Sequence, residues 1–464
     1  MKNQEIISEY SFRGILKEVL SYKSGVAALV ILIFFGVMIL YTVIRFPYGE
    51  TIGLWNSSTA FLKNPRNAPP VWWSIFTGKK DPRNIELKFN VDKSNITDEG
   101  NIFKTELKKD FLYDYDDFPT ELNIFFNARY RKNPPLVKIY LVRPDGDKIL
   151  LKEHTIRSED DVLYLSNDFS LENRLDSQVR AKIPSGIDFS VTVTRGLFLK
   201  YSGKLDVLKG NYSLILDVEL NDANDELTAD AVVYGKVYGI AGTDHLRRPI
   251  HIALLWGAPL DLSFGLGASL SITLLHLIIA TISGWYGGWV DSLIQRFTEI
   301  YMVLPFLPIM IMISLFYKLN LWSLLAVVVL LSMFGFGIKT TRALVLQVKT
   351  LPYIEAAQVY GASNWRIIFL YIIPKILPPV IPSLVASVPV YVFLEAILAL
   401  FGVLDPTQPT WGMVIEEAFN NGALYKGYFY WVLIPSSLLI LTAISFSLLG
   451  FILDRIVNPK LKEL

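Results

Sequence analysis

Long apolar runs alternate with polar segments along the chain, and the lengths of these runs predict its main elements. Six runs extend over about 20 residues, the length of helix that crosses a bilayer core of about 30 Å. They span residues 25–46, 263–285, 297–317, 321–338, 377–401 and 428–453. The pattern predicts an α-helical polytopic membrane protein with six transmembrane helices. The first run is too long for the apolar part of a signal peptide, so we interpret it as a retained anchor.

A polar segment, residues 47–250, separates the first two runs and shows a different pattern. Apolar and polar residues alternate in "ELNIFFNARY", "VKIYLVRPDGDKILLKEH", "DFSVTV" and "NYSLILDVEL", and a period of two is typical of half-buried strands. Pro144, Asp145 and Gly146 form a turn signal between two apolar runs, because proline presets one turn dihedral and glycine tolerates the other. We therefore predict an inserted all-β, sandwich-like domain at about residues 84–237.

Composition narrows the chemistry of the chain. Of its 464 residues, 52% are hydrophobic and 19% are charged, and the formal net charge is +1. These values describe a membrane protein with a soluble part and argue against a nucleic-acid partner. The absence of cysteine excludes disulfides, thiolate catalysis and Cys-ligated zinc. Because no nucleophile, acid pair or metal-ligand spacing is visible, we predict no catalytic site, no cofactor and no metal. The four histidines, which do not stand at the spacing of metal ligands, are His154, His245, His251 and His276.

One acidic segment of the insert, "KKDFLYDYDDFP", allows two interpretations. Its carboxylates could hold calcium, or they could form a solvated acidic face. Calcium loops use a central glycine for the sharp turn that positions their oxygen ligands, and this segment has none. The solvated face is therefore the favoured interpretation.

The basic residues of the short loops predict the side of the membrane on which each segment lies, because lysine and arginine favour the cytoplasmic side. They gather in the N-terminal tail 1–24, after the second run, in the loop 339–376 and in the C-terminal tail. These residues are Lys2, Arg13, Lys17, Lys23, Arg296, Lys339, Arg342, Lys349, Arg366, Lys375, Arg455, Lys460 and Lys462. The opposite short loops offer Lys318 and Lys426. We therefore predict a protein of the cell membrane whose two termini lie on the cytoplasmic side and whose residues 47–250 lie on the extracellular side.

One polar loop between apolar runs has an unusual pattern, "EAAQVYGASNWRIIF" at residues 355–369. Glu355 suits the positive end of a helix dipole, and the two alanines after it are small enough for a partner to approach closely. Gly361 permits a sharp turn between two short helices. The simpler interpretation is an amphipathic loop whose alanines only favour helix. The spacing from Glu355 through Gly361 to Pro374 instead favours a rigid elbow that another protein binds.

This loop resembles the "EAA" loop of bacterial and archaeal ABC import permeases. The segments "GTDHLRRP", "YGGWVDSLIQRFTEIYMVLPFLP" and "FLEAILALFGVLDPTQPTWGMVIEEA" are similar to the dipeptide, oligopeptide and nickel branch of that family. The similarity covers residues 240–464 well and residues 10–47 loosely. Arg247-Arg248-Pro249 stands where the branch usually has Gly-Arg-Asp, and the large insert matches nothing in the usual pattern of the branch.

The resemblance implies a permease core at 251–464 that forms half of a translocation path for peptides, or for a related solute such as an oligosaccharide or nickel. It implies a second homologous permease subunit, two ATP-binding cassette ATPase subunits that hydrolyse the ATP, an extracellular substrate-binding protein and the lipid bilayer as partners. Closure of the ATPase pair would move the loop and open the path outward. By resemblance, the ATPase-coupling residues are Glu355, Ala356, Ala357, Gly361, Ala362, Trp365 and Pro374.

Two ionisable residues fall inside predicted transmembrane helices, where a polar group is costly enough to suggest a function. Glu395, whose neighbours match the family, is assigned to the translocation path or to a helix interface. For His276, hydrogen bonding between helices competes with a role at the path, because no partner is visible in the sequence. The fifth predicted helix contains prolines that predict a broken or kinked helix. They are Pro378, Pro379, Pro382 and Pro389.

Other classes of protein explain the sequence less well. A membrane-anchored receptor or sensor would also join membrane helices to an outside β-domain, but the loop 339–376 is too short to be a signalling domain. An enzyme would need a catalytic cluster. The role of the insert stays open between docking of the binding protein and a spacer on the outer surface.

Overall fold

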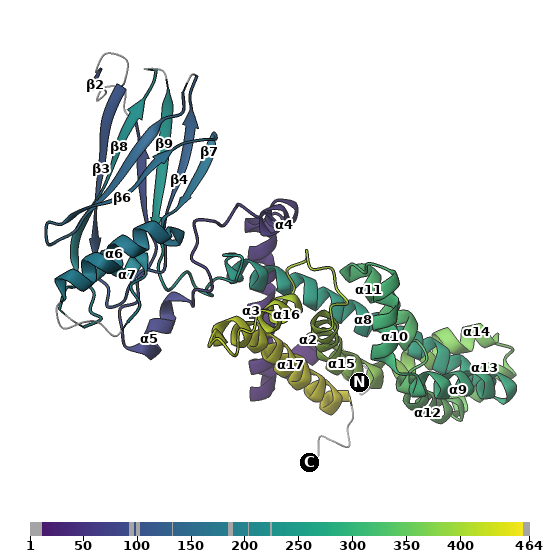
Figure 1. The fold of residues 1–464 in the computed structure, drawn as a ribbon. Helices are drawn as coiled ribbons and strands as arrows, with labels where there is room; N and C mark the ends of the chain where they lie inside the picture. Colours follow the sequence, from purple (N-terminus) through teal and green to yellow (C-terminus); the bar gives the residue numbers. More distant parts are fainter. Residues whose placement is uncertain are drawn as a thin grey trace. The chain divides into compact units, whose positions relative to one another are not determined.

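A computed structural model of the chain describes residues 12–91, 97–98, 103–131, 133–183, 189–202, 204–222 and 225–457 (Figure 1). The predicted inside residues Lys2, Lys460 and Lys462 lie outside the described residues. The chain divides into two compact units. The helical unit comprises residues 1–56 and 251–464, and the insert comprises Ser57–Ile250.

Apolar helices form the helical unit. Within the described residues, four spans are long and apolar enough to cross a membrane: α3 (Lys23–Arg45), α8 (Ile250–Tyr286), α14 to α15 (Asn364–Leu400) and α17 (Phe429–Val457). Two further candidates are bent pairs. They are α9 (Gly288–Val303) with α10 (Phe306–Phe316), bent by 79°, and α11 (Leu321–Ser332) with α12 (Phe336–Lys349), bent by 54°. The prediction of six spans therefore holds only if each bent pair is one span. Shorter helices are α2 (Phe12–Ser21), α4 (Tyr48–Trp55), α13 (Pro352–Val359) and α16 (Trp411–Asn420).

The two bends have local causes. Pro305 precedes α10 in an extended conformation, and proline lacks the N–H that would continue the preceding helix. Gly335 precedes α12 and is also extended. Both residues interrupt runs that look uniformly apolar in the sequence, which is why hydrophobicity alone predicts straight spans there.

The prolines of α15 (Ile373–Leu400) do not break it. The helix is continuous across Pro378, Pro379, Pro382 and Pro389, so of the two predicted alternatives, a break or a kink, the break is absent and the kink stays a prediction. The irregular hydrogen bonding lies earlier, in a π-helical segment, η4 (Ile368–Ile372), directly before α15. Short π-helical segments inside helices are frequent at functional sites.

The insert contains two antiparallel sheets. One has the strand order β1-β9-β4-β7 and the other β2-β3-β8-β5-β6, and buried residues of both sheets belong to one core. The predicted hairpin at Pro144-Asp145-Gly146 is confirmed, because it joins β5 to β6 and Gly146 adopts φ +89°. The strands are β1 (Ile85–Asn90), β2 (Thr97–Asp98), β3 (Phe103–Tyr113), β4 (Leu122–Arg129), β5 (Leu136–Val142), β6 (Lys148–Thr155), β7 (Asp160–Tyr164), β8 (Gly210–Leu220) and β9 (Glu226–Val233).

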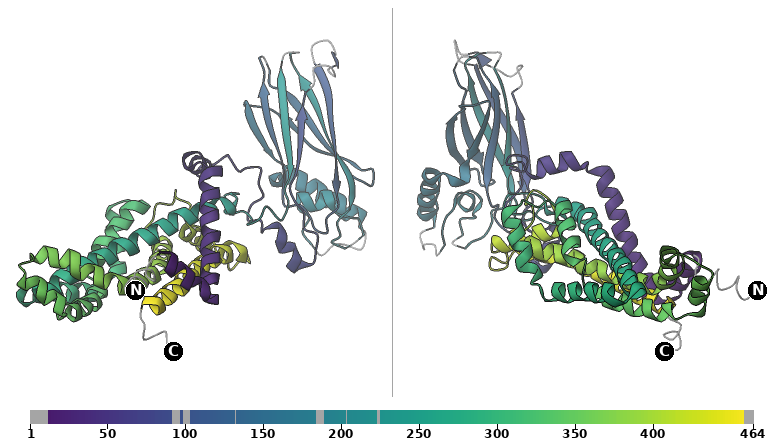
Figure 2. Two further views of the ribbon diagram at one scale, coloured as in Figure 1. Left: turned by 180° about the vertical axis from the view of Figure 1, so that it is seen from behind. Right: turned by 90° about the vertical axis from the view of Figure 1, so that its right-hand side faces the viewer.

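The prediction that the insert is all-β is wrong. It contains α6 (Phe169–Lys182) and α7 (Val193–Phe198), which lie at one end of the sheets (Figures 1 and 2). Asp168 caps α6 by accepting hydrogen bonds from the backbone N–H groups of the residues after it, and apolar residues four apart form its buried face. These residues are Leu171, Leu175 and Val179. The predicted strand "DFSVTV" is absent from the described part of that segment, residues 189–193, where α7 begins at Val193.

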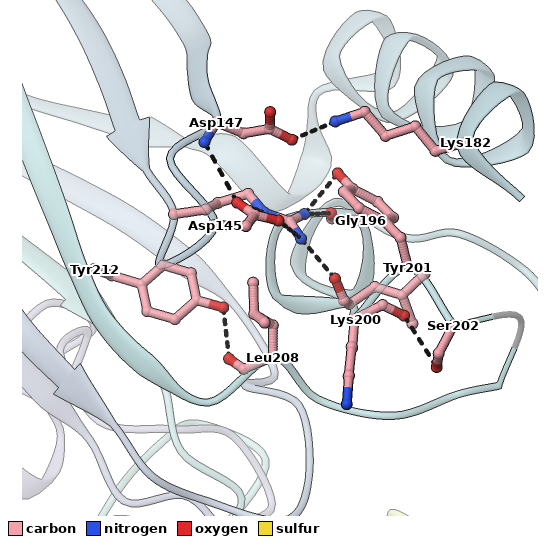
Figure 3. Close-up of polar contacts among 11 residues, drawn as sticks. Asp145, Asp147, Lys182, Gly196, Lys200, Tyr201, Ser202, Leu208 and Tyr212 are labelled. Carbon is pink, nitrogen blue, oxygen red and sulfur yellow. Dashed lines mark hydrogen bonds and ion pairs between the residues drawn. The ribbon is translucent and has the colours of Figure 1, made fainter.

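A buried arginine ties α7 to the β5–β6 hairpin. The side chain of Arg143 is 0% exposed and pairs with Asp145 at 2.9 Å. Its guanidinium also donates to the backbone oxygens of Gly196 and Leu199 at 3.2 and 2.7 Å. Figure 3 shows Asp145, Gly196 and Tyr201 converging at this point, and the Tyr201 hydroxyl accepts a further hydrogen bond at 2.7 Å. Because all these partners satisfy the charge, its burial is tolerated.

The acidic segment of the insert pairs with lysines from other parts of the same unit. Asp114 accepts from Lys80 at 2.7 Å, Asp116 from Lys209 at 2.6 Å and Asp117 from Lys236 at 2.5 Å. These pairs are at least partly exposed, so each contributes little to stability. The segment is therefore a face of surface ion pairs rather than of carboxylates in solvent alone.

Candidate functional site

The loop at residues 355–369 forms two short helices joined by a tight turn. Glu355 lies in the first turn of α13, where a carboxylate stabilises the helix dipole. After this helix, Gly361 adopts the left-handed conformation with φ +78°. The Ala362 N–H donates to the Ala357 oxygen at 3.0 Å, and the Gly361 N–H donates to the Gln358 oxygen at 2.9 Å. These are the two bonds of a Schellman motif, and the predicted sharp turn is confirmed.

The second arm of this elbow leads directly into a long apolar helix. Ser363 caps α14 (Asn364–Ile367) by accepting a hydrogen bond from the Arg366 N–H. The π-helical segment η4 follows, and then α15 begins, with Pro374 in its first turn. Because proline has no N–H to donate to the preceding turn, the irregular π-helical hydrogen bonding lies directly before it. The elbow and α15 therefore form one continuous span from Asn364 to Leu400.

The elbow buries one face and exposes the other. Ile354 and Ile367 are fully buried, and Ala357 and Ala362 pack half-buried against the same apolar cluster. Ala357 thus contacts the protein's own core, whereas we predicted that both alanines would face a partner. The outward face contains large apolar side chains with exposed fractions from 40% to 90%. They are Tyr353, Val359, Tyr360, Trp365 and Phe369, and Glu355 and Ala356 are exposed beside them.

Polar contacts fasten α12, which precedes the elbow, to α8 and α9. Arg342 forms a two-pronged pair with Asp291, with Nε at 2.6 Å from the carboxylate. Ser283 of α8 donates to the same carboxylate at 2.5 Å. Lys349 donates to the backbone oxygens of Gly284 and Trp285 at 3.3 and 2.6 Å, which places a positive charge at the negative end of α8. The elbow is therefore mounted on a braced group of helices.

A cavity of about 290 Å³ lies between α8, α12 and α15. Its walls combine apolar side chains with hydroxyl groups, and His276 is one of the lining residues. The polar lining residues are Thr273, His276, Thr340, Thr341, Ser383, Ser387 and Tyr391. Among the lining residues in the described part of the chain, none carries a carboxylate, an ammonium or a guanidinium group. Such a surface hydrogen-bonds polar groups without holding a charge.

His276 also joins α8 to the bend between α11 and α12. Its Nε2 lies 2.9 Å from the Ser332 oxygen and 3.2 Å from the Gly335 nitrogen. A Cβ at Gly337 would lie 2.3 Å from the imidazole, so the ring occupies a notch that only glycine leaves open. His276 is thus hydrogen-bonded between helices and lines the cavity, and its role at a translocation path stays a prediction.

Glu395 does not line this cavity. It is fully buried, and its Oε2 would lie 2.8 Å from a Cβ at Gly412 in α16. The Thr410 hydroxyl interacts with its carboxyl, but neither Glu395 oxygen reaches a regular hydrogen bond within the described residues. Asp261 of α8 is close enough to interact electrostatically, and it accepts the Trp411 N–H at 2.9 Å. Glu395 therefore lies at the junction of α8, α15 and α16.

The sequence did not reveal two of these features. Asp291 and Arg342 are far apart in the chain, and from the sequence alone each is interpreted as a charged residue of a loop. Asp261 lies just before a predicted span, so it was not counted among intramembrane carboxylates. Each of these charged residues lies beside a long apolar run, where an unpaired charge is costly. That position was the signal in the sequence that each of them needs a partner.

Apolar helices around a hydroxyl-lined cavity, with an exposed elbow on a braced group of helices, form the architecture of a multi-pass membrane protein. Residues 276–463 match the model of the family described as binding-protein-dependent transport system inner membrane component. The chain is 27% identical over 223 residues to the dipeptide transport system permease protein DppC of Bacillus subtilis, covering 48% of this chain and 69% of that protein.

Two further relatives show similar coverage. The oligopeptide transport system permease protein OppC of Bacillus subtilis is 27% identical over 224 residues, which cover 48% of this chain and 72% of that protein. The glutathione transport system permease protein GsiD of Pectobacterium atrosepticum is 27% identical over 223 residues, which cover 48% and 73%. Residues 276–463 therefore match this family of inner membrane transport components, and the chain is similar to relatives named as permeases for dipeptides, oligopeptides and glutathione. The matched segment includes the elbow, α12 and α15, and the insert lies outside it.

Proposed function

We propose that this chain is one of two permease subunits of an ATP-driven importer and forms half of its translocation path. The observation that carries this proposal is the elbow, which exposes Tyr360 and Trp365 while its opposite face is packed on the helical unit. A surface with large exposed apolar side chains on a rigid support is typical of a site that binds another protein. Its proposed partner is an ATP-binding cassette ATPase, one for each permease subunit.

The proposed cargo is a peptide delivered by an extracellular binding protein. The relatives are named as permeases for dipeptides, oligopeptides and glutathione. Hydroxyl groups such as those of Thr273 and Ser383 in the cavity wall can exchange hydrogen bonds with the amide groups of a peptide as it passes. The lining offers one imidazole, that of His276, and otherwise hydroxyl groups, which makes it less suited to nickel, since transition metals prefer several nitrogen or sulfur ligands. An oligosaccharide would also find hydrogen-bond partners there.

In the proposed orientation, both termini and the elbow lie on the cytoplasmic side of the cell membrane, and the insert lies on the extracellular side. The chain contains no cysteine, so single cysteines report on their own position without a background. A membrane-impermeant thiol reagent applied to intact cells should label Lys148→Cys in the insert and should leave Tyr360→Cys in the elbow unlabelled. The reverse pattern would overturn this orientation.

The coupling role of the elbow is tested by substitutions at Gly361. A Cβ there would meet no atom within 4 Å, so a β-carbon disturbs the turn through the left-handed backbone conformation and not through a clash. Gly361→Val should abolish ATPase association and transport, because β-branched residues avoid φ near +78°. Gly361→Asn is the matched control, since asparagine tolerates the left-handed conformation, and it should keep most of both activities.

Glu355 gives a second, electrostatic arm of the same test. Glu355→Arg reverses an exposed charge on the outward face and should weaken co-purification of the ATPase, while Glu355→Gln should weaken it less. All variants should insert into the membrane at the normal level. Full substrate-stimulated ATPase activity of the assembled Gly361→Val complex would refute the coupling assignment.

A further inference from the structure

One surface of the insert is unusually apolar for a polar domain. It comprises Trp72, Ile75, Phe76 and Ile240, with exposed fractions of 40%, 79%, 74% and 72%. We call this surface the stem patch. Elsewhere in the insert, large exposed apolar side chains such as Leu112 and Phe169 belong to separate elements, β3 and α6. The stem patch therefore stands out as a group.

The stem patch is built on a short rigid scaffold. Trp72 and Trp73 lie in η1 (Val71–Trp73), and Phe76 lies in α5 (Ser74–Thr77). The ring of Phe76 lies 6.3 Å from that of Trp72 and 5.6 Å from that of Trp73. The Trp72 indole N–H donates to the Ile240 oxygen at 2.8 Å. The aromatic rings are thus held in place although their outer surfaces are exposed.

Two segments that connect the insert to the membrane helices support this patch. The Tyr238 N–H donates to the Pro69 oxygen at 2.8 Å, and the Val71 N–H donates to the Gly239 oxygen at 2.9 Å. The second segment then runs directly into α8, which begins at Ile250. Ten residues of extended chain span at most about 35 Å, so Ile240 lies within that distance of the start of an apolar helix.

The chemistry of the stem patch matches a membrane interface. Tryptophan is enriched there because its ring is apolar and its N–H is polar. Exposed isoleucine and phenylalanine side chains gain free energy when they leave water for the acyl region. Lys79 follows α5 and is exposed, a position that suits the phosphate of a lipid headgroup. A soluble partner protein would not require the patch to lie beside the segment that enters the bilayer.

We propose that the stem patch inserts into the lipid headgroup and upper acyl region of the leaflet on the insert's side. The occupant of this surface is the bilayer itself. Phe76 and Ile75 enter the apolar layer, and Trp72 stays at its polar boundary with its N–H bonded to Ile240. The two connecting segments already attach one end of the insert to the membrane helices. The stem patch would attach the same end to the bilayer as well.

Spin labels on the full chain in nanodiscs of phosphatidylcholine and phosphatidylglycerol test this proposal. Ile75→Cys and Phe76→Cys each provide a labelling site in a chain without cysteine, and Phe169→Cys is the control because Phe169 is 80% exposed on α6. Oxygen concentrates in lipid, and a nickel chelate stays in water. We expect the ratio of oxygen to nickel collisions to be several-fold higher at positions 75 and 76 than at 169.

Two results would overturn the proposal. Water-like collision ratios at both patch positions, equal to that at 169, would show that the patch stays in solvent. Labels shielded from oxygen and from the nickel chelate alike would show that a protein surface covers the patch. Two independent labelling positions guard against a single variant that fails to fold.

Discussion

In the insert, the rings of Tyr113, Phe198 and Tyr212 pack against one another at tilted and edge-on angles with centroids 4.7 to 6.3 Å apart, and all three are fully buried. In α3 of the helical unit, Val30 and Ile33 are 60% and 63% exposed. The same kinds of residue thus have opposite surroundings in the two units. The sheets of the insert enclose their apolar side chains in a core of their own, whereas α3 leaves its apolar surface to the membrane.

This difference shows where each unit obtains its specificity. In the insert, burial of apolar surface drives folding, and polar contacts such as those of Arg143 select one arrangement of the hairpin and α7. Between membrane helices, lipid is as apolar as the side chains, so burial alone selects little. There the notch around His276 and the pair between Asp291 and Arg342 determine how helices meet. Mutations of polar residues should therefore act differently in the two units.

The largest expected effect follows from Arg143→Met in the insert. The substitution removes the partner of the Gly196 and Leu199 oxygens and leaves Asp145 unpaired. The Asp145 side chain is 33% exposed and stays partly solvated, so the main cost comes from the two buried backbone oxygens, at about 1–3 kcal/mol for each acceptor left unsatisfied. Hydrogen exchange of the purified full chain should show much faster exchange in α7 and in the β5–β6 hairpin, and unchanged exchange in α8.

Arg129→Met is the matched control for this substitution. Arg129 also pairs with an acidic residue of the insert, Glu159, but both side chains are mostly exposed. Exposed pairs contribute little, so exchange should stay at the wild-type level. Equal protection in both variants would contradict the view that Arg143 holds α7 in place.

A smaller effect is expected for Arg342→Met in the helical unit. Hydrogen bonds to charged groups contribute about 1.5–3 kcal/mol, and the Arg342 side chain is 30% exposed, so the lower end is expected. Protease cleavage near the elbow should accelerate, while the insert should resist as before. Arg296→Met is the control, because Arg296 is 77% exposed in α9. Faster protease cleavage of the insert in Arg342→Met would contradict the view that the two units respond independently to such a substitution.

The smallest effect concerns the cap of α6 and depends on pH. Burial raises the pKa of Asp168, but hydrogen bonds from Lys152, Ser170 and the Leu171 N–H outweigh it and lower the pKa from 3.8 to about 2. The folded pKa therefore lies below the unfolded one. The stabilisation is complete above the unfolded value of 3.8 and is lost as the pH falls through about 2.

Asp168→Ala tests this cap. Removing a capping carboxylate costs about 1 kcal/mol, so exchange in α6 should accelerate modestly at neutral pH. Between pH 4 and pH 2, the wild type should lose protection in α6 that the variant has already lost. A wild type and a variant with identical exchange of α6 across this range would rule out a stabilising role for the cap.

The sequence predicted features that depend on neighbouring residues. The turn at Gly361 and the hairpin at Gly146 each follow from glycine at a fixed offset, and both are present. The helix α6 was missed although Asp168 and leucines four residues apart signal it, because the surrounding alternation favoured strands. The pair of Asp291 with Arg342 and the burial of Arg143 depend on segments about 50 residues away along the chain. No local pattern specifies such contacts.

The low burial of α3 has a consequence for the order of synthesis. Only 17% of its apolar window is buried inside the protein, compared with 33% to 39% for the other continuous spans. At about 5–20 residues per second, the ribosome needs about 10–40 s to make the insert, Ser57–Ile250, before α8 emerges. During this interval α3 can reside in the membrane alone, and the insert can close its own core. The remaining membrane helices would then assemble beside a domain that has already folded.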